Sequence, residues 1–192
     1  MTTTAPPVRL TEAALECIAA YGVRKTSLSD VAGRAGVSRS TVYRAFGDKE
    51  GLMRAVVAAE MSRFLEQLDH VVPWDAPLSA ALEQAIAFTM RYLESHSAFQ
   101  RVLRYEPEEL IDVVLERPNG DERSLHPLLR AAAAERLKAT GYRFRVASEQ
   151  AAEWLLRSAL SLLLAPTTSV ATPRELADLI LHGIAPRVGE GH

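Results

Sequence analysis

Apolar residues recur along almost the whole chain at the spacing of amphipathic helices, and the alternation that is typical of strands is scarce. Between Leu10 and Tyr21, for example, apolar side chains return every three or four residues and predict one buried stripe on a helix. Proline, glycine and capping residues divide the pattern into segments. The sequence therefore predicts an all-α fold, with helices over residues 8–21, 28–35, 39–46, 49–70, 78–95, 98–105, 108–115, 124–139, 146–164 and 173–185.

The short helices near the N-terminus have the clearest boundaries. Ser27, Ser38 and Asp48 are N-cap residues by type and position. Asp30 follows Ser27 by three residues, in the arrangement of a capping box with aspartate in place of glutamate. Gly36 provides the tight turn between two of these helices. The stretch is thus predicted to contain two short, closely connected helices followed by a long one.

The buried positions of the two short helices determine what their other faces expose. Val31 and Ala32 are predicted to point inward from the first helix, and Val42 and Phe46 from the second. The outer face of the second helix then carries two guanidiniums, a hydroxyl and a phenol, from Arg39, Ser40, Tyr43 and Arg44. Arginine can donate two hydrogen bonds to guanine, and hydroxyls donate to phosphate oxygens. This face is typical of a surface that reads DNA, and a helical hairpin with merely solvated basic residues is the alternative.

Three helix starts fall close together in this stretch, after Ser27, Ser38 and Asp48. The free backbone N–H groups of a helix N-terminus attract phosphate. The hydroxyl of Thr26 and the ammonium of Lys49 lie beside two of these starts in the sequence. We expect them to hold the DNA backbone on either side of the groove.

The net charge of −2 argues against nucleic acid until it is divided along the chain. Residues 1–54 contain eight basic and five acidic residues, a net charge of +3, and the remaining residues have a net charge of −5. A basic N-terminal quarter on an acidic body is expected when one small domain meets phosphate. Hydrophobic residues make up 48% of the 192 residues, which is enough for a packed core.

The stretch from Thr26 to Leu52 resembles the DNA-binding domain of the TetR family of bacterial transcriptional regulators. The positions that match the family pattern are Ser27, Leu28, Val31, Ala32, Ala35, Gly36, Val37, Ser38, Thr41, Val42, Tyr43, Phe46, Lys49, Glu50 and Leu52. The likeness covers residues 8–54, and the remainder matches only in length and helical content. Ser27 stands where threonine is more usual. Ala45 replaces the histidine of many members, which implies that one contact with the DNA backbone is missing.

The resemblance implies a helix-turn-helix DNA-binding domain over residues 1–47, with residues 1–7 as a disordered tail. Residues 48–192 would form a helical ligand-sensing and dimerisation domain. The implied phosphate contacts come from Thr26, Ser38, Thr41, Tyr43 and Lys49, with Ser27 at a helix start. The implied base contacts come mainly from Arg39, Ser40 and Arg44. The expected function is that of a repressor, which a small molecule releases from a pseudo-palindromic operator in double-stranded DNA.

Two helices near the C-terminus, predicted over residues 146–164 and 173–185, are unusually apolar. Their apolar faces include Ala151, Trp154 and Leu155 in the first helix, and Leu176 and Leu179 in the second. Two such helices from each of two chains would form the four-helix interface of a homodimer. Packing within a single chain is the alternative.

Aromatic and leucine side chains of the body are candidates for lining a ligand cavity. They are Phe64, Phe88, Tyr92, Phe99, Leu103, Tyr105, Leu128 and Trp154. An ordinary hydrophobic core would use the same residue types and is the alternative. Because pockets between helices are mostly apolar, we expect an uncharged or lipophilic ligand.

No catalytic site, metal site or cofactor is predicted, and we expect the chain not to be an enzyme. The five histidines include no pair four residues apart and no HExxH motif, and glycine-rich phosphate loops are lacking. Glu106, Glu108 and Glu109 are interpreted as a solvated acidic helix start, and Cys17 as a core residue. Two other functions stay open, namely a helical protein-interaction module with a non-functional DNA motif and a DNA-binding regulator without a ligand.

The apolar runs are too short for a membrane-spanning helix, which requires about 18 to 20 residues. The polar, proline-bearing N-terminal stretch lacks the apolar segment of a signal peptide. We therefore expect a cytoplasmic protein with no membrane partner.

Overall fold

The computed structural model describes residues 7–109, 126–141, 143, 145–164 and 172–184, and within these the regular elements are all helices. Four helices form the N-terminal part: α1 (Pro7–Tyr21), α2 (Leu28–Ala35), α3 (Arg39–Phe46) and the long α4 (Lys49–Val71). The body adds α5 (Leu78–Ser95), α6 (Ser97–Tyr105), α8 (His126–Ala139), α9 (Ser148–Leu164) and α10 (Pro173–Ile184). The all-α prediction is confirmed.

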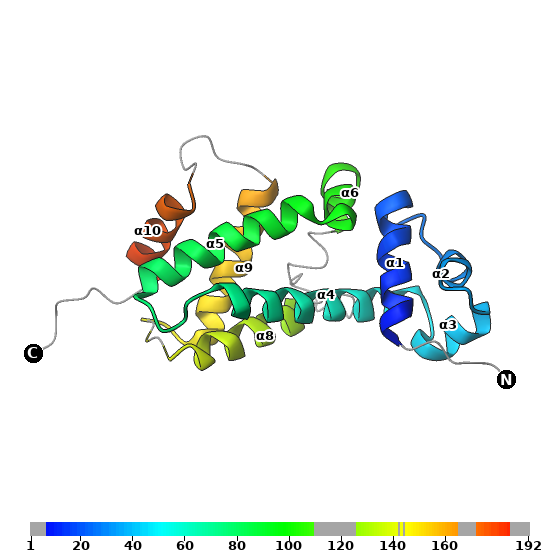
Figure 1. Ribbon diagram of the computed structural model, residues 1–192, viewed down its shortest axis with the longest axis horizontal. Helices are drawn as coiled ribbons and strands as arrows, with labels where there is room; N and C mark the ends of the chain where they lie inside the picture. Colours follow the sequence, from blue (N-terminus) through cyan, green and yellow to red (C-terminus); the bar gives the residue numbers. More distant parts are fainter. Residues whose placement is uncertain (1–6, 110–125, 142, 144, 165–171, 185–192) are drawn as a thin grey trace, which may run out of the picture.

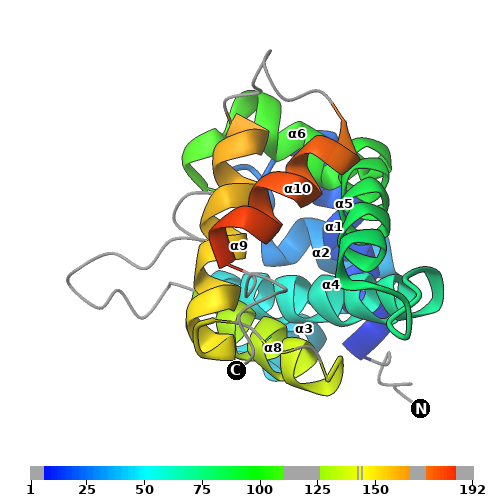
Figure 2. The same ribbon diagram turned by 90° about the vertical axis from the view of Figure 1, so that its left-hand side faces the viewer.

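The molecule is elongated, with α1, α2 and α3 gathered at one end and most of the other helices at the other (Figure 1). α4 runs from the N-terminal end into the body, where α5 packs along it. Figure 2 shows α5 and α9 on opposite sides of the body, with α10 crossing between them. α10 packs on α5 and α8 packs on α9, whereas α6 packs against α1. Two helices, α4 and α6, therefore connect the two ends of the molecule.

One apolar core joins the N-terminal helices to both of these connecting helices. Val31 and Val42, from α2 and α3, are completely buried. Leu52 and Val56 of α4 belong to the same cluster, and so does Val102 of α6. Packing therefore continues across the domain boundary predicted after residue 47. The boundary itself stays a prediction.

The capping residues predicted for the short helices are confirmed. The Ser27 hydroxyl accepts the Asp30 N–H, and the Asp30 carboxylate accepts the Ser27 N–H, so the capping box is complete. Hydrogen bonds from the side chain and then the backbone of Ser27 hold the pKa of Asp30 below its usual value. The Ser38 hydroxyl caps α3 by accepting the Thr41 N–H, and the Asp48 carboxylate caps α4 by accepting the Gly51 N–H.

Some details at the N-terminal end differ from the sequence prediction. Tyr21 is 47% exposed instead of buried, because it is the last residue of α1 and the chain turns away at Gly22. Pro7 begins α1 instead of ending a tail, at a helix start where its missing N–H costs nothing. Cys17 is buried in the core as predicted, and burial raises the pKa of its thiol. The predicted tail before Pro7 and most of the predicted helix 108–115 lie outside the described residues.

The first turn of α4 lies very close to the end of α3. A Cβ atom at Gly51 would be 2.0 Å from the carbonyl oxygen of Phe46, far inside contact distance. The Gly51 N–H also donates to Asp48 Oδ1 over 2.7 Å. A residue without a side chain thus allows the close approach that fixes α3 relative to α4. None of the described helices is both long and apolar enough to cross a membrane.

This approach predicts opposite effects for the same substitution at two helical glycines. Gly51→Ala should lower the free energy of unfolding by about 2 kcal/mol, because the new methyl group overlaps backbone. Gly33→Ala should raise it by about 0.5–1 kcal/mol, because Gly33 lies in α2 with open space around it. Urea unfolding at one fixed protein concentration measures both effects. Similar changes for the two variants would contradict the close contact.

Candidate nucleic-acid interface

The outer face of α3 carries the side chains that the sequence predicted. Arg39, Ser40, Tyr43 and Arg44 are all exposed, and Tyr43 has 61% of its surface accessible. Neither arginine forms an ion pair within the part of the chain that the structure describes. Ala45 is also exposed, so a small side chain occupies this surface position. The face thus presents uncompensated positive charge and hydrogen-bond donors to the solvent.

Hydrogen bonds order the start of this helix. The Ser38 hydroxyl lies 2.8 Å from the Ser40 hydroxyl and 2.9 Å from the Thr41 hydroxyl. It also accepts the Thr41 N–H over 3.2 Å. Arg44 Nε donates to the Ser40 carbonyl over 3.4 Å, which folds the guanidinium back along its own helix. These contacts order the polar groups before any DNA is bound.

A hollow of about 370 Å³ lies beside α3, where the α1–α2 turn, the start of α2 and the α3–α4 turn meet. Its walls bring together five of the predicted contact residues, Thr26, Ser27, Arg39, Tyr43 and Lys49. Arg24 and Lys25 line it too, although the sequence prediction included them only in the net charge. Their position directly before Thr26 is the signal that could have identified them.

Two of the predicted phosphate contacts are buried. Thr26 is 1% exposed, and its hydroxyl donates to the Gly22 carbonyl over 2.7 Å. Thr41 is 8% exposed and lies against Ser38. Their hydroxyls stabilise the domain from inside, which argues against direct phosphate contacts from these two side chains. Lys49 is half-buried, and its Nζ donates to the Arg24 carbonyl over 2.8 Å.

Three of the predicted ligand-binding residues pack on one another between α4 and α5. The ring centroids of Phe64, Phe88 and Tyr92 are 5.2 to 5.7 Å apart. Phe88 is 9% exposed, and Leu68 and Val72 belong to the same cluster. These aromatic rings fill the space between the helices in this part of the body. This arrangement corresponds to an ordinary hydrophobic core, the alternative to a ligand cavity.

The other predicted ligand-binding residues do not join this cluster. Tyr105 is 59% exposed, with the Arg101 guanidinium 4.4 Å from its ring centroid, and Trp154 is 39% exposed on α9. Both lie at the surface because they occupy outward faces of their helices. Phe99 and Leu103 are partly buried on α6, and the Leu128 side chain lies outside the described ones. Ligand contacts from the whole set stay a prediction.

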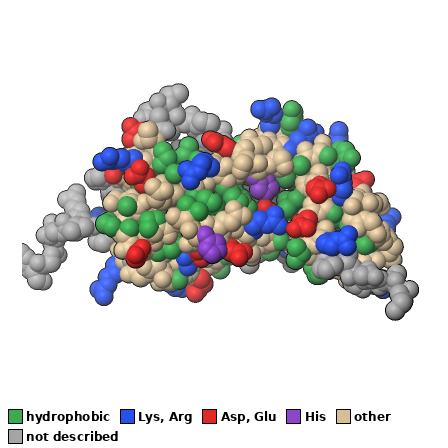
Figure 3. Space-filling view, in the orientation of Figure 1, with side chains coloured by type: hydrophobic (Ala, Val, Ile, Leu, Met, Phe, Trp, Pro, Cys, Tyr) green, Lys and Arg blue, Asp and Glu red, His purple; other side chains and the backbone are tan. Residues whose placement is uncertain are grey.

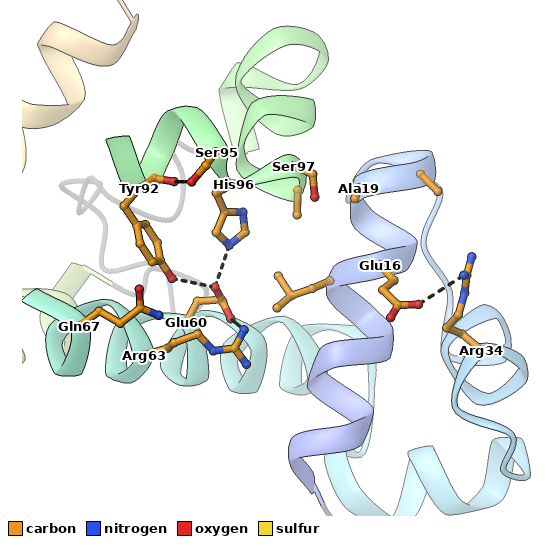
Figure 4. Close-up of a pocket in the computed structure, with 13 residues that line it drawn as sticks. Glu16, Ala19, Arg34, Glu60, Arg63, Gln67, Tyr92, Ser95, His96 and Ser97 are labelled. Carbon is orange, nitrogen blue, oxygen red and sulfur yellow. Dashed lines mark hydrogen bonds and ion pairs between the residues drawn. The ribbon is translucent and has the colours of Figure 1, made fainter. Parts of the chain in front are cut away.

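A larger cleft, of about 750 Å³, lies between the N-terminal helices α1 and α2 and the helices that face them (Figure 4). α1 and α2 form one wall, while α4, the end of α5 and the start of α6 form the other. Of the predicted ligand-binding residues whose side chains the structure describes, only Tyr92 lines it. Figure 3 shows acidic, basic and histidine side chains gathered where the two ends of the molecule meet. This junction is therefore polar, unlike the apolar pocket that the sequence predicted.

Glu60 is at the centre of the polar wall (Figure 4). Its carboxylate accepts from Tyr92 Oη at 3.2 Å and His96 Nε2 at 2.7 Å, and it pairs with Arg63 at 3.1 Å. His96 Nδ1 accepts the Phe99 N–H and caps α6, so in a neutral ring the proton is on Nε2. Burial raises the pKa of Glu60, but His96 and Arg63 together outweigh burial and hold it below its usual value. Burial and the nearby carboxylate raise the pKa of Tyr92 to about 12.

Sequence reasoning missed this cluster because its members are far apart in the chain. His96 and Glu60 are separated by 36 residues, and the search for metal sites considered only histidine pairs at helical spacing. Among the described residues there is no group of three side chains that could hold a metal ion.

The family model described as bacterial regulatory proteins of the tetR family matches residues 10–56. These residues cover most of α1, all of α2 and α3, and the first part of α4. Over these residues the chain is similar to the DNA-binding region of the TetR family. The matched model describes regulatory proteins, which agrees with the expectation that the chain is not an enzyme.

The chain is 32% identical, over 98 residues, to an uncharacterised HTH-type transcriptional regulator of Mycobacterium bovis. The aligned part covers 51% of this chain and 50% of that protein, so the chain spans about half the length of the curated relatives it matches.

Solved structures share the fold over nearly the whole length. The TetR family repressor AlkX from a Dietzia species has a TM-score of 0.62 at 21% identity, with 93% of each chain covered. The transcriptional regulator FadR from Bacillus subtilis has a TM-score of 0.58 at 17% identity, covering 91% of this chain and 95% of that one.

The hydrogen bonds of Glu60 predict a change of stability with pH. A carboxyl group whose pKa is lowered by folding stabilises the fold above its unfolded pKa, near 4.5, and this stabilisation is lost as the pH falls through the folded pKa. We expect Glu60→Gln to lower the melting temperature at neutral pH, and the difference from the unmodified chain to shrink below about pH 4.

Melting curves between pH 3 and pH 7 measure this effect, with Glu66→Gln, an exposed position on the same helix, as the control. The control should melt like the unmodified chain. A deficit for Glu60→Gln that is the same at both ends of this pH range would contradict the role of the ionised carboxylate.

Proposed function

We propose that this chain is a transcriptional repressor that binds a pseudo-palindromic operator as a homodimer and leaves it when a small molecule binds. The observation that carries the proposal is the outer face of α3, where Arg39, Ser40, Tyr43 and Arg44 are exposed while Val42 anchors the helix in the core. Short helices of this kind enter the major groove. The protein AlkX, which has a similar fold, is described as a TetR family repressor.

Base reading falls to Arg39, Ser40 and Arg44 in this proposal, because only the outer face of α3 can lie on the floor of the groove. Phosphate contacts come from the hydroxyls of Tyr43, Ser27 and Ser38 and from the ammonium of Lys49, with Lys25 as an addition. Lys25 is exposed beside the same hollow. Because the proposed partner is genomic DNA, the chain works in the cytoplasm.

The proposed dimer uses α9 and α10. Ala151 and Ala152 of α9 and Ala177 and Ile180 of α10 are buried within the chain. Leu179 is nevertheless 56% exposed and Trp154 39% exposed, so both helices retain apolar side chains that a second copy could cover. A twofold axis through such an interface would place two recognition helices in successive major grooves, about 34–36 Å apart.

The proposed ligand is lipophilic and binds among the helices of the body. FadR of similar fold was solved in complex with stearoyl-CoA, and AlkX is implicated in the biodegradation of n-alkanes. Phe99 and Leu103 of α6 are aromatic or aliphatic and only partly buried, which suits contact with a long hydrocarbon chain.

Stearoyl-CoA, added to the complex of protein and duplex, should release the duplex, because a ligand that prefers the unbound conformation shifts the equilibrium toward it. Fluorescence anisotropy of a labelled duplex measures the release, and free coenzyme A is the control. Retention of the duplex with both compounds would contradict an acyl-CoA ligand and would favour another lipophile or a regulator without a ligand.

The proposed contacts with bases and phosphates differ in their expected response to substitution. Arg39→Ala should reduce the preference for a selected duplex over a scrambled one by about 1–3 kcal/mol. Lys49→Ala should weaken binding to both duplexes equally and reduce the slope of log K against log salt by about 0.9. Titrations of both duplexes at several salt concentrations measure these quantities.

An unchanged preference in Arg39→Ala would contradict the base contact. An unmodified chain that shows no salt-dependent duplex binding would contradict the proposed function as a whole. It would instead favour the protein-interaction module.

A further inference from the structure

Glu106 follows the C-terminal end of α6 and reaches into the N-terminal end of the molecule. The sequence interpretation of this residue as part of a solvated acidic helix start is wrong, because it is only 9% exposed. Its Oε2 accepts the Val23 N–H over 2.6 Å, and its Oε1 accepts the Arg24 N–H over 3.3 Å. One carboxylate thus binds two successive backbone N–H groups of the α1–α2 turn, 83 residues away from Val23 in the chain.

The turn is shaped to admit this carboxylate. A Cβ atom at Gly22 would be 2.7 Å from Glu106 Oε1, so the approach requires a residue without a side chain at this position. Gly22 also has a φ of +87°, which other residues rarely adopt. The Gly22 carbonyl in turn accepts the buried hydroxyl of Thr26. The whole turn between α1 and α2 is therefore built around the Glu106 contact.

The same turn holds a residue of the DNA-binding surface. Lys49 Nζ donates to the carbonyl of Arg24, whose N–H binds Glu106. Lys49 in turn lines the hollow beside α3, together with Arg39 and Tyr43. A continuous set of contacts leads from the Glu106 carboxylate through the Arg24 backbone to the Lys49 ammonium.

We propose that Glu106 is a positioning residue for DNA binding, through which α6 sets the place of the α1–α2 turn and of Lys49. The proposal rests on the proposed function, since it requires that the chain binds DNA. α6 packs on α1 and also on α5 of the body, so a displacement of α6 moves the turn (Figure 1). The contact gives the body a direct route to a phosphate-binding residue, in addition to the covalent route along α4.

Two neighbouring carboxylates provide matched controls. Glu108 and Glu109 pair with the side chain of Arg24, with Glu109 Oε1 at 3.0 Å from Nε, and the Arg24 side chain is 58% exposed. They bind no backbone N–H of the turn in the contacts described. Removing their charges frees a guanidinium beside the hollow and removes repulsion from phosphate. Simple charge effects therefore predict tighter DNA binding when any of the three glutamates is neutralised.

If Glu106 positions the turn, neutralising Glu106 alone should weaken DNA binding instead of strengthening it. Glu106→Gln keeps the size of the side chain, but its NH₂ group cannot accept one of the two N–H groups. We expect this variant to bind a selected duplex about tenfold more weakly, and the slope of log K against log salt to fall by about 0.9. The double variant Glu108→Gln, Glu109→Gln should bind as tightly as the unmodified chain or more tightly.

A double-mutant cycle tests whether Glu106 acts through Lys49. In a Lys49→Ala background, Glu106→Gln should cause little further loss of affinity, because the affected contact is already missing. Arg44 lies on the outer face of α3 and does not line the hollow. In an Arg44→Ala background, the fold-losses of DNA affinity from the two substitutions should therefore multiply. Losses that multiply in both backgrounds, or equal or tighter binding by Glu106→Gln, would overturn the proposal.

Melting curves show whether each variant is folded at the temperature of the binding assay. Should Glu106→Gln unfold there, hydrogen exchange of the Val23 and Arg24 amides in the unmodified chain decides. The duplex should slow their exchange, because coupling between two sites is reciprocal, and unchanged exchange would overturn the proposal. Failure of the unmodified chain to bind any duplex would instead overturn the proposed function, so the two failures are distinguishable.

Discussion

The burial of a few aliphatic side chains in one small core determines where the exposed face of α3 lies. Val31, Val42 and Leu52, from three successive helices, are completely inaccessible to solvent. A helix of eight residues, such as α3, is too short to be stable alone, so its position depends on tertiary packing. The close approach of Gly51 to the Phe46 carbonyl then sets the angle at which α4 leaves. Because packing fixes the inner face of α3, the helix exposes its arginines in one orientation.

Among the described helices, only a few connect the two ends of the molecule. α4 belongs to both cores, and α6 contributes Val102 to the N-terminal core and Glu106 to the α1–α2 turn. Between them lies the polar cleft, where Glu60 and His96 connect α4 to the start of α6. A change in the body that shifts α6 therefore acts on the N-terminal end by contact. Energetic coupling requires a contiguous set of contacts or a shared equilibrium of this kind.

Local sequence rules predicted the helices and their caps well. Ser27 with Asp30, and Ser38 with Thr41, interact across three residues, so the short-range pattern contains the information. The exposed face of α3 followed from the same helical spacing. What the sequence could not provide were contacts between distant residues, such as Glu106 with Val23 or His96 with Glu60. Tyr105 shows a related limit, because an aromatic residue on a helix reveals neither its partner nor its exposure.

The central claim is that α3 reads a base sequence from a twofold-symmetric pair of chains. Selection of bound duplexes from a random pool tests it most directly, because the result contains half-site, spacing and symmetry together. The account predicts an enriched inverted repeat whose half-site centres lie about 10 to 10.5 base pairs apart, or slightly more. A single unrepeated site would contradict the symmetric pair, and a pool without any enriched sequence would contradict base reading by α3.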